Sequence, residues 1–242
     1  MHPSTVTYIY QFQGFIGVRV GFISDVHANV TALRTVLDDI EAKGVDAIYN
    51  SGDLVGYYPF PNETIELLRA RNVCSIQGNH DRSVLDSRTE RMNPWASSAV
   101  RWTAAHISDD AVRYLASLPS SLNFQIGKVR CSMHHGSPQD PDEYVHPERA
   151  DQQLLELSNS WLLVLGHTHV PFAKVTEKGV IMNPGSVGQP RDGDPRSSYA
   201  IFDSDSGDIE HFRIAYDIAA VQEAVRKAGL PSSLGERLAQ GW

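Results

Sequence analysis

Residues 74–83 read CSIQGNHDRS, a short apolar segment that runs into Gly78 and is followed directly by Asn79, His80 and Asp81. The apolar part is typical of a short strand. An amide, an imidazole and a carboxylate just beyond a strand are groups that bind metal ions or transfer protons. This stretch therefore predicts a site built where strands end.

The chain before this stretch alternates strand-like and helix-like segments. VRVGFIS (18–24) and DAIYNSGD (46–53) read as strands. Asn29 is a suitable N-cap for a helix with an apolar face over 30–40, and the Pro-led segment 61–71 predicts a second helix. Strand, helix, strand, helix, strand in this order favours parallel pairing in an α/β fold.

The rest of the chain is richer in strands. Residues 92–118 predict a helical excursion in two pieces with Ser108 as an N-cap, and it could form a lid, a dimer contact or core. The segments 122–126 and 129–135 predict a hairpin. Further strands are expected at 161–169, 171–175, 179–183, 198–203 and 208–214, with helices over 147–158 and 217–228 and a frayed tail after the latter. A mixed sheet, or two stacked sheets flanked by helices, accommodates this order.

Composition and charge exclude several functions. The chain has 242 residues, of which 41% are hydrophobic, as in an ordinary globular protein. Its net charge of −8 opposes binding to nucleic-acid polymers. Cys74 and Cys131 lie far apart in apolar segments, so we expect buried free thiols and a reducing, cytoplasmic setting. No apolar run is long enough for a membrane helix. Residues 1–17 form a leader, either an edge strand or a disordered tail, and residues 18–242 a single domain.

Five apolar segments end in side chains that can bind metal ions. The seven candidate ligands are Asp25, His27, Asp53, Asn79, His135, His167 and His169. Loops at the carboxyl ends of strands converge on one crevice, so residues remote in sequence can meet there. Mixed oxygen and nitrogen donors suit divalent transition metals, and seven donors exceed the needs of one ion. A bridging Asp53 would allow two ions about 3.5–4 Å apart.

Each motif also has a structural interpretation. Asp25, Asn79 and Asp81 could begin turns or cap helices. His167 and His169 alternate, so they could mark the polar face of a strand. The conjunction of five such motifs at strand ends favours the metal site.

In order along the chain, SDVH, SGD, GNHD, HHG and GHTH resemble the motif series of the calcineurin-like metallophosphoesterases, from about Val18 to about Asp203. The surrounding sequence resembles their smaller bacterial and archaeal phosphodiesterase branch. The resemblance implies a four-layer α-β-β-α sandwich of two mixed β-sheets flanked by helices. It also implies a two-metal hydrolase of a small phosphate ester, such as a phosphodiester or nucleotide.

The resemblance also implies roles for the residues. Asp25, His27, Asp53 and His169 would hold one ion, and Asp53, Asn79, His135 and His167 the other. His135, next to glycine, takes the family position, and His134 lies beside it. Manganese is the first expectation, and iron, zinc, cobalt and nickel are compatible.

A hydroxide shared by the ions would attack phosphorus, and His80 would protonate the leaving oxygen. Asp81 would orient His80 or cap a turn. In several protein-phosphatase relatives, an aspartate three residues after the bridging one supports the catalytic histidine, whereas this chain has Gly56 there.

Substrate contacts are expected outside the metal motifs. In the Gly/Pro-rich segment 183–199, Arg191 or Arg196 could clamp a phosphate, or the segment could be a plain surface loop. Tyr57 could stack on a nucleobase or serve in packing. A protein Ser/Thr phosphatase and a catalytically weak scaffold of the same fold remain alternatives, and an oligomer is compatible with the sequence.

Overall fold

The computed structural model describes residues 6–7, 17–90 and 92–242. The leader predicted over residues 1–17 therefore lies mostly outside the described residues. Within it, Val6–Thr7 form strand β1, which pairs in parallel with a strand of the larger sheet.

The first half of the chain follows the predicted alternation. Its elements are β2 (Arg19–Ile23), α1 (Val30–Ala42), β3 (Ala47–Asn50), α2 (Pro61–Ala70) and β4 (Cys74–Ser75). The three strands pair in parallel, as expected. Asn29 caps α1, because its side chain accepts a hydrogen bond from the backbone N–H of Ala32 at 3.1 Å.

Two mixed sheets make up the centre of the molecule. The five-stranded sheet has the order β11-β10-β2-β3-β4, and the six-stranded sheet has the order β1-β5-β6-β7-β9-β8. The remaining strands are β5 (Ser121–Ile126), β6 (Val129–His134), β7 (Leu162–Val164), β8 (Phe172–Val175), β9 (Val180–Asn183), β10 (Ser197–Asp203) and β11 (Ile209–Ile214). The predicted hairpin is formed by β5 and β6.

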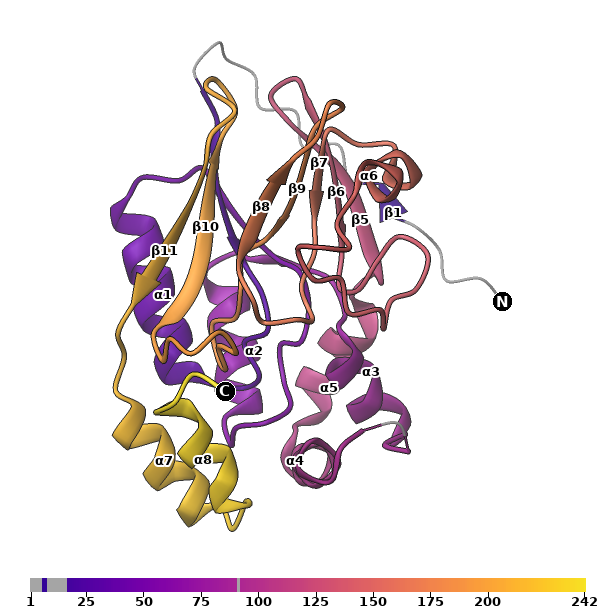
Figure 1. The fold of residues 1–242 in the computed structure, drawn as a ribbon. Helices are drawn as coiled ribbons and strands as arrows, with labels where there is room; N and C mark the ends of the chain where they lie inside the picture. Colours follow the sequence, from indigo (N-terminus) through magenta and orange to yellow (C-terminus); the bar gives the residue numbers. More distant parts are fainter. Residues whose placement is uncertain (1–5, 8–16, 91) are drawn as a thin grey trace.

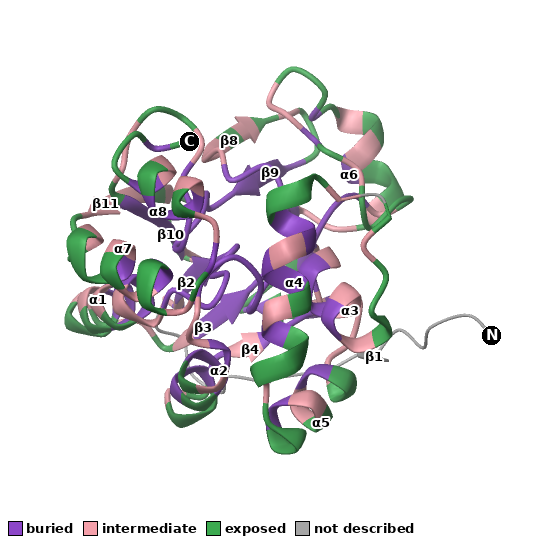
Figure 2. Ribbon diagram, turned by 90° about the horizontal axis from the view of Figure 1, so that it is seen from below, coloured by how far each residue is buried: buried purple, intermediate pink, exposed green. Residues whose placement is uncertain are grey.

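The sheets pack face to face with helices outside them, which confirms the four-layer α-β-β-α sandwich (Figure 1). Phe22 and Phe202 of the smaller sheet share one buried cluster with Phe124 and Met133 of the larger sheet. On the far side of the smaller sheet, α1 and α2 pack in a second cluster. Helix α6 (Gln152–Ser158), shorter than predicted, covers the outer face of the larger sheet. The helices expose their outward faces, whereas β7, β9 and most of β2, β3 and β10 are buried and the edge strands β8 and β11 are partly exposed (Figure 2).

Three helices join the two sheets at one end of the molecule. They are α3 (Asn79–Asp86), α4 (Pro94–His106) and α5 (Asp109–Ser117). Ser108 caps α5 as predicted, by accepting a hydrogen bond from Ala111 at 3.2 Å. Of the three roles considered for this excursion, α4 shows a core role, since Ala96 and Ala99 pack with Tyr57 and Tyr58.

The prediction of a frayed tail after residue 228 is wrong. Helix α7 (Ile218–Lys227) is followed by a further helix, α8 (Ser232–Leu238). Leu234 and Leu238 of α8 are buried against Val221 and Val225 of α7. The two helices form a hairpin that packs on α4. The Trp102 indole of α4 donates a hydrogen bond to the carbonyl of Ala228, at the end of α7, at 3.0 Å.

Candidate metal centre

The structure brings all seven predicted ligands together at the ends of the strands. Asp25 and His27 follow β2, Asp53 follows β3, Asn79 begins α3, His135 follows β6, and His167 and His169 follow β7. Six are buried and Asn79 is partly buried. The loops that carry them belong to both sheets, so the cluster lies where the ends of the two sheets meet.

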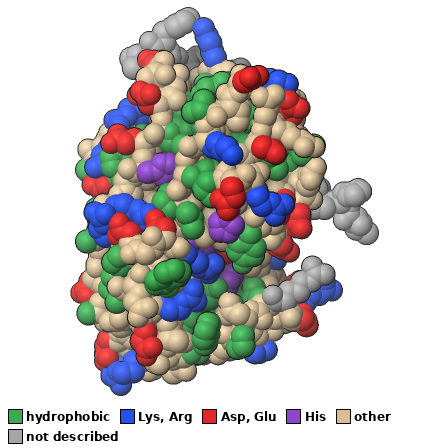
Figure 3. Space-filling view, viewed as in Figure 1, with side chains coloured by type: hydrophobic (Ala, Val, Ile, Leu, Met, Phe, Trp, Pro, Cys, Tyr) green, Lys and Arg blue, Asp and Glu red, His purple; other side chains and the backbone are tan. Residues whose placement is uncertain are grey.

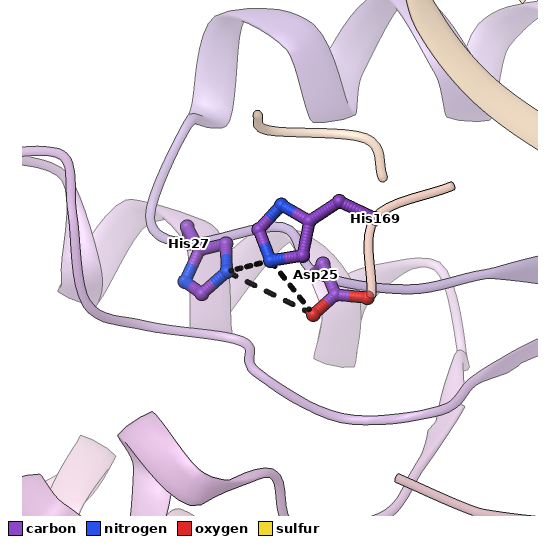
Figure 4. Close-up of side chains that lie close together, drawn as sticks. All are labelled: Asp25, His27 and His169. Atoms are coloured by element: carbon purple, nitrogen blue, oxygen red, sulfur yellow. Dashed lines mark hydrogen bonds and ion pairs between the residues drawn. The ribbon is translucent and has the colours of Figure 1, made fainter. Parts of the chain in front are cut away.

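One group contains Asp25, His27 and His169 (Figure 4). The Nε2 atoms of the two histidines lie 3.1 Å apart, and Asp25 Oδ1 lies 3.3 Å from His169 Nε2 and 3.8 Å from His27 Nε2. Asp25 Oδ1 is buried and has no hydrogen-bond partner among the described residues. A buried carboxylate oxygen without a donor is costly unless a cation lies against it. This donor set therefore fits a metal ion.

A second group contains Asp53, His135 and His167. His135 Nε2 lies 3.4 Å from Asp53 Oδ2 and 3.0 Å from the side-chain oxygen of Asn79. Asp53 Oδ2 also lies 3.7 Å from His27 Nε2, which belongs to the first group. One carboxylate thus lies between the two groups, where it could contact an ion in each.

The backbone at these positions is strained. Five of the seven residues have a positive φ, between 51° and 67°: Asp25, His27, Asp53, His167 and His169. For residues other than glycine the left-handed region is sparsely populated, and such strain gathers at functional sites. Both histidines after β7 lie beyond the end of that strand, so the alternative of a polar strand face is wrong.

Backbone carbonyls orient the imidazole rings. The Nδ1 atoms of His27, His135 and His169 lie 3.3, 2.9 and 2.5 Å from the carbonyl oxygens of Val55, Ser51 and Gln189. A ring that donates from Nδ1 keeps the lone pair of Nε2 for a metal. His167 has the opposite arrangement, because its Nε2 lies 3.2 Å from the Asp142 carbonyl, which leaves Nδ1 for a metal.

The electrostatics of His27, His169 and Asp53 suit metal binding. Burial would lower the pKa of His135, but Asp53 raises it to about 9, so a metal ion must displace a proton from this ring. Burial lowers the pKa of His27 and His169 well below the usual value, so both rings are neutral near pH 7. Burial alone would raise the pKa of Asp53, but the neighbouring His135 and His80 lower it well below the usual value. Burial raises the pKa of Asp25 to about 7. Neutral imidazoles and an ionised Asp53 are the forms that bind metal ions.

His80 lies beside the first group, and with His27 and Asp53 it makes up a third group whose atoms could hold a metal ion. Its ring is 4% exposed and lies 4.7 Å from the ring of His27, centroid to centroid. The Nδ1 atom of His80 is buried and has no hydrogen-bond partner among the described residues. A Cβ atom on Gly56 would lie 2.5 Å from this Nδ1. The ring therefore occupies the space that an aspartate side chain at position 56 would need.

Asp81 caps α3, which was the second of the two roles considered for it. Its carboxylate accepts hydrogen bonds from the backbone N–H groups of Gly78, Val55 and Leu54 at 2.9, 3.0 and 3.2 Å. These bonds tie the start of α3 to the loop after Asp53. Gly78 is required for a related reason, since a Cβ atom there would lie 2.0 Å from Asp53 Oδ1.

The predicted substrate contacts have different outcomes. The Nη2 atom of Arg191 lies 3.1 Å from the Tyr57 hydroxyl and 3.0 Å from Gln189 Oε1, next to the histidines. Arg196, in contrast, forms hydrogen bonds with Asp194 and is 53% exposed at its side chain. The Tyr57 ring is 2% exposed and lies 4.6 Å from the rings of His27 and His80. It packs against histidines, and this is the packing role considered for it.

Sequence reasoning missed two residues at the site. Gln189 accepts from His169 through its carbonyl and from Arg191 through its side chain, and its amide donates to Tyr58 at 2.9 Å. The Tyr144 ring stacks on the ring of His167 with centroids 3.9 Å apart. Gln189 lies in the loop already singled out by its Gly/Pro content, whereas no pattern distinguished Tyr144.

Most of the chain is similar to known proteins. The sequence profile of the calcineurin-like phosphoesterase superfamily domain matches residues 18–207. The chain belongs to the calcineurin-like phosphoesterase superfamily. The chain is 37% identical to protein MJ0912 of Methanocaldococcus jannaschii over 240 residues, 92% of this chain and 98% of the relative. It is 26% identical to phosphodiesterase YfcE of Escherichia coli over 201 residues, 78% of this chain and 89% of the relative.

A solved structure is similar over nearly the whole chain. The crystal structure of a metallophosphoesterase from Sphaerobacter thermophilus has a TM-score of 0.81 and 39% identity, and the match covers 93% of this chain and 99% of that one. The described part of this phosphoesterase chain contains no helix that is long and apolar enough to cross a membrane. The family and the acidic and histidine groups together identify a phosphoester hydrolase with candidate metal-binding residues.

Proposed function

We propose that this protein is a metal-dependent phosphodiesterase or phosphatase that hydrolyses a small phosphate ester at a pair of divalent ions. Asp25, His27, Asp53 and His169 would hold one ion, and Asp53, Asn79, His135 and His167 the other. Such ions lower the pKa of a bound water and neutralise charge on the phosphoryl oxygens. The position of the Asp53 carboxylate between the two groups supports this proposal most strongly. Asp53 Oδ2 lies 3.7 Å from His27 Nε2 in the first group and 3.4 Å from His135 Nε2 in the second.

In this proposal, His80 donates a proton to the leaving oxygen. Burial lowers the pKa of His80 to about 4, so the free protein holds a neutral ring near pH 7. An anionic phosphate next to the ring favours the protonated form, so substrate binding raises this pKa. A histidine in this role contributes a rate factor of roughly 10²–10⁴.

Arg191 would bind a phosphoryl oxygen opposite the ions. Tyr57 and Gln189 hold its guanidinium beside the histidines, and the positive charge of Arg191 contributes to the lowered pKa of both His80 and His169. A planar guanidinium can donate two parallel hydrogen bonds to a phosphate.

The metal is proposed to be manganese, with iron, zinc, cobalt and nickel as the other candidates, since mixed imidazole and carboxylate donors accept all of them. A cytoplasmic setting agrees with free Cys74 and Cys131.

The test combines metal analysis with an assay. Mn²⁺-loaded protein is expected to hydrolyse bis(p-nitrophenyl) phosphate, assayed beside the p-nitrophenyl monoester, and the Asp53→Asn variant is expected to lose both metal and activity. The Asp194→Asn variant is the matched control, because Asp194 pairs with Arg196 away from the cluster. A metal-loaded wild-type protein that hydrolyses neither ester would contradict the proposal.

A further inference from the structure

A cavity of about 650 Å³ opens beside the candidate metal centre. Asn79 and His167, two proposed ligands of the second ion, line its inner end, and α3 and the loop containing Asp140 and Tyr144 form its walls. Volumes of 300–1,000 Å³ are typical of small-molecule sites. On the side of the molecule seen in Figure 3, histidine side chains reach the surface near the middle, with acidic and basic side chains beside them. The cavity is therefore continuous with the proposed phosphate position.

Tyr144 offers an aromatic surface in this cavity. Its side chain is 50% exposed and lines the cavity, while its ring stacks on His167 with 30° between the ring planes. Exposed tyrosines are common, but this ring lies against a proposed metal ligand at the inner end of a cavity. A flat ring on a bound ligand could lie against it at little entropic cost, because the stack on His167 already fixes the tyrosine.

The charged groups in the cavity do not favour a second phosphate. Arg82 forms an ion pair with Asp142, and Arg88 Nε lies 3.9 Å from Asp86. Glu90 and Asp140 also line the cavity. Arg82 Nη1 is buried and has no hydrogen-bond partner among the described residues, but each guanidinium group has a carboxylate neighbour. The lining carboxylates of Asp86, Glu90, Asp140 and Asp142 outnumber the two guanidinium groups in the described part of the lining. A ligand portion with hydroxyl or N–H donors fits this lining better than an anionic one.

We propose that this cavity holds the alcohol portion of the substrate, and that Tyr144 selects esters whose alcohol carries a flat, uncharged ring of nucleoside size. This inference rests on the proposed function and specifies its substrate class. Tyr144 is a specificity residue here, since it contacts the alcohol portion of the ester. Esters with a further phosphate group, such as polyphosphates, are disfavoured.

Binding of inert ligands tests the inference directly. Phenylphosphonate, methylphosphonate and 4-phosphonobenzoate differ in the ring and in its charge but share the phosphonate group. By isothermal titration calorimetry of the Mn²⁺-loaded protein, phenylphosphonate is expected to bind at least about fivefold more tightly than methylphosphonate, because stacking contributes roughly 1–3 kcal/mol. It is also expected to bind more tightly than 4-phosphonobenzoate, because the carboxylate of that ligand would lie beside the acidic side chains of the cavity. Tyr144→Ala is expected to remove the advantage over methylphosphonate, and Tyr144→Phe to keep it.

A second variant does not depend on the contact between Tyr144 and His167. Ser83 lines the cavity from α3, and Ser83→Trp is expected to fill it. This variant should weaken binding of phenylphosphonate while leaving methylphosphonate binding and metal content unchanged. Hydrolysis of bis(p-nitrophenyl) phosphate and of methyl p-nitrophenyl phosphate, which share a leaving group, is measured on the same preparations.

The possible failures are distinguishable. If the wild-type protein hydrolyses neither ester, the proposed function is wrong, and the inference fails with it. If both esters are hydrolysed but phenylphosphonate binds no more tightly than methylphosphonate, only the inference fails. Equal weakening of both phosphonates by Tyr144→Ala and by Ser83→Trp would also overturn the inference alone.

Discussion

At the scale of single residues, sequence patterns predicted which side chains gather at the site, but not their backbone conformations or all of their contacts. Metal-binding residue types just after predicted strands identified the seven side chains of the cluster, because the loops that follow parallel strands meet at one edge of the sheet. The left-handed backbone at His167 and His169 was not predictable, since residue type seldom specifies this conformation outside glycine. Tyr144 was missed because its partner His167 lies far along the chain, and only the folded chain brings the two rings together.

The adjacent histidines His134 and His135, at the end of β6 and just after it, provide a matched pair. His135 Nε2 lies among the oxygens of Asp53 and Asn79, whereas His134 Nε2 lies 2.8 Å from the Ser132 hydroxyl. We expect His135→Ala to lose at least one bound ion per chain and His134→Ala to keep both, as measured by elemental analysis. Loss of metal in the His134 variant alone would reverse this assignment.

The two thiols give a pH prediction. Cys131 is buried as expected, whereas Cys74 is only half-buried. Burial raises the pKa of Cys74 from 9.0 to about 11 and that of Cys131 to about 12. Between pH 9.0 and about 11 the unfolded chain loses the Cys74 proton while the folded chain keeps it, so rising pH favours unfolding.

At pH 8 each thiol of the folded protein should react with iodoacetamide at least about 100-fold more slowly than in the unfolded chain, because thiolate is the reactive form. Mass spectrometry of the alkylated residues measures both rates. Equal rates in the two states would contradict the buried-thiol interpretation.

At the scale of elements, helices with a strong apolar periodicity were predicted from the sequence, whereas a short helix without one was missed. Helix α1 was predicted from a cap and one apolar face, and its buried residues Leu33, Val36, Leu37 and Ile40 lie on that face. Helix α8 was missed because it has only 7 residues, contains Gly235 and lacks a side-chain cap. Tertiary burial of Leu234 and Leu238, rather than helix propensity, stabilises such a segment.

The C-terminal hairpin is expected to support the site. The Tyr58 hydroxyl joins the Leu234 carbonyl of α8, at 3.4 Å, to the Gln189 amide. Leu234→Ala should lower the free energy of unfolding by about 2–5 kcal/mol, because a buried leucine is lost. Urea denaturation measures this change, and the exposed Glu236→Ala on the same helix should stay within about 0.5 kcal/mol of wild type. Equal effects of the two variants would show that α8 does not pack as described.

At the scale of the whole molecule, the order of elements predicted layers but did not assign strands to sheets. Sequence alone left one mixed sheet or two stacked sheets open, because apolar strands are compatible with both. The structure has two sheets. After β9 in the larger sheet, the chain crosses to the smaller sheet, where β10 pairs antiparallel with β2. That return brings the loop containing Arg191 to the cluster, so the site requires the complete pair of sheets.

Metal binding should stabilise the whole fold. The unfolded chain cannot assemble the seven ligands, so an ion at about 1,000 times its Kd adds roughly 4 kcal/mol to the free energy of unfolding. For a chain of this size, that corresponds to a rise in Tm of roughly 8–16 °C. Calorimetry with Mn²⁺ and then with a chelator measures the shift. The Asp53→Asn variant should show a much smaller shift, and an equal shift would contradict the bridging role.

Anomalous diffraction at the manganese edge from crystals of the Mn²⁺-loaded protein tests the central proposal most directly. We predict two peaks per chain about 3.5–4 Å apart, with the Asp53 carboxylate between them. A single peak, or two peaks that Asp53 does not bridge, would contradict it.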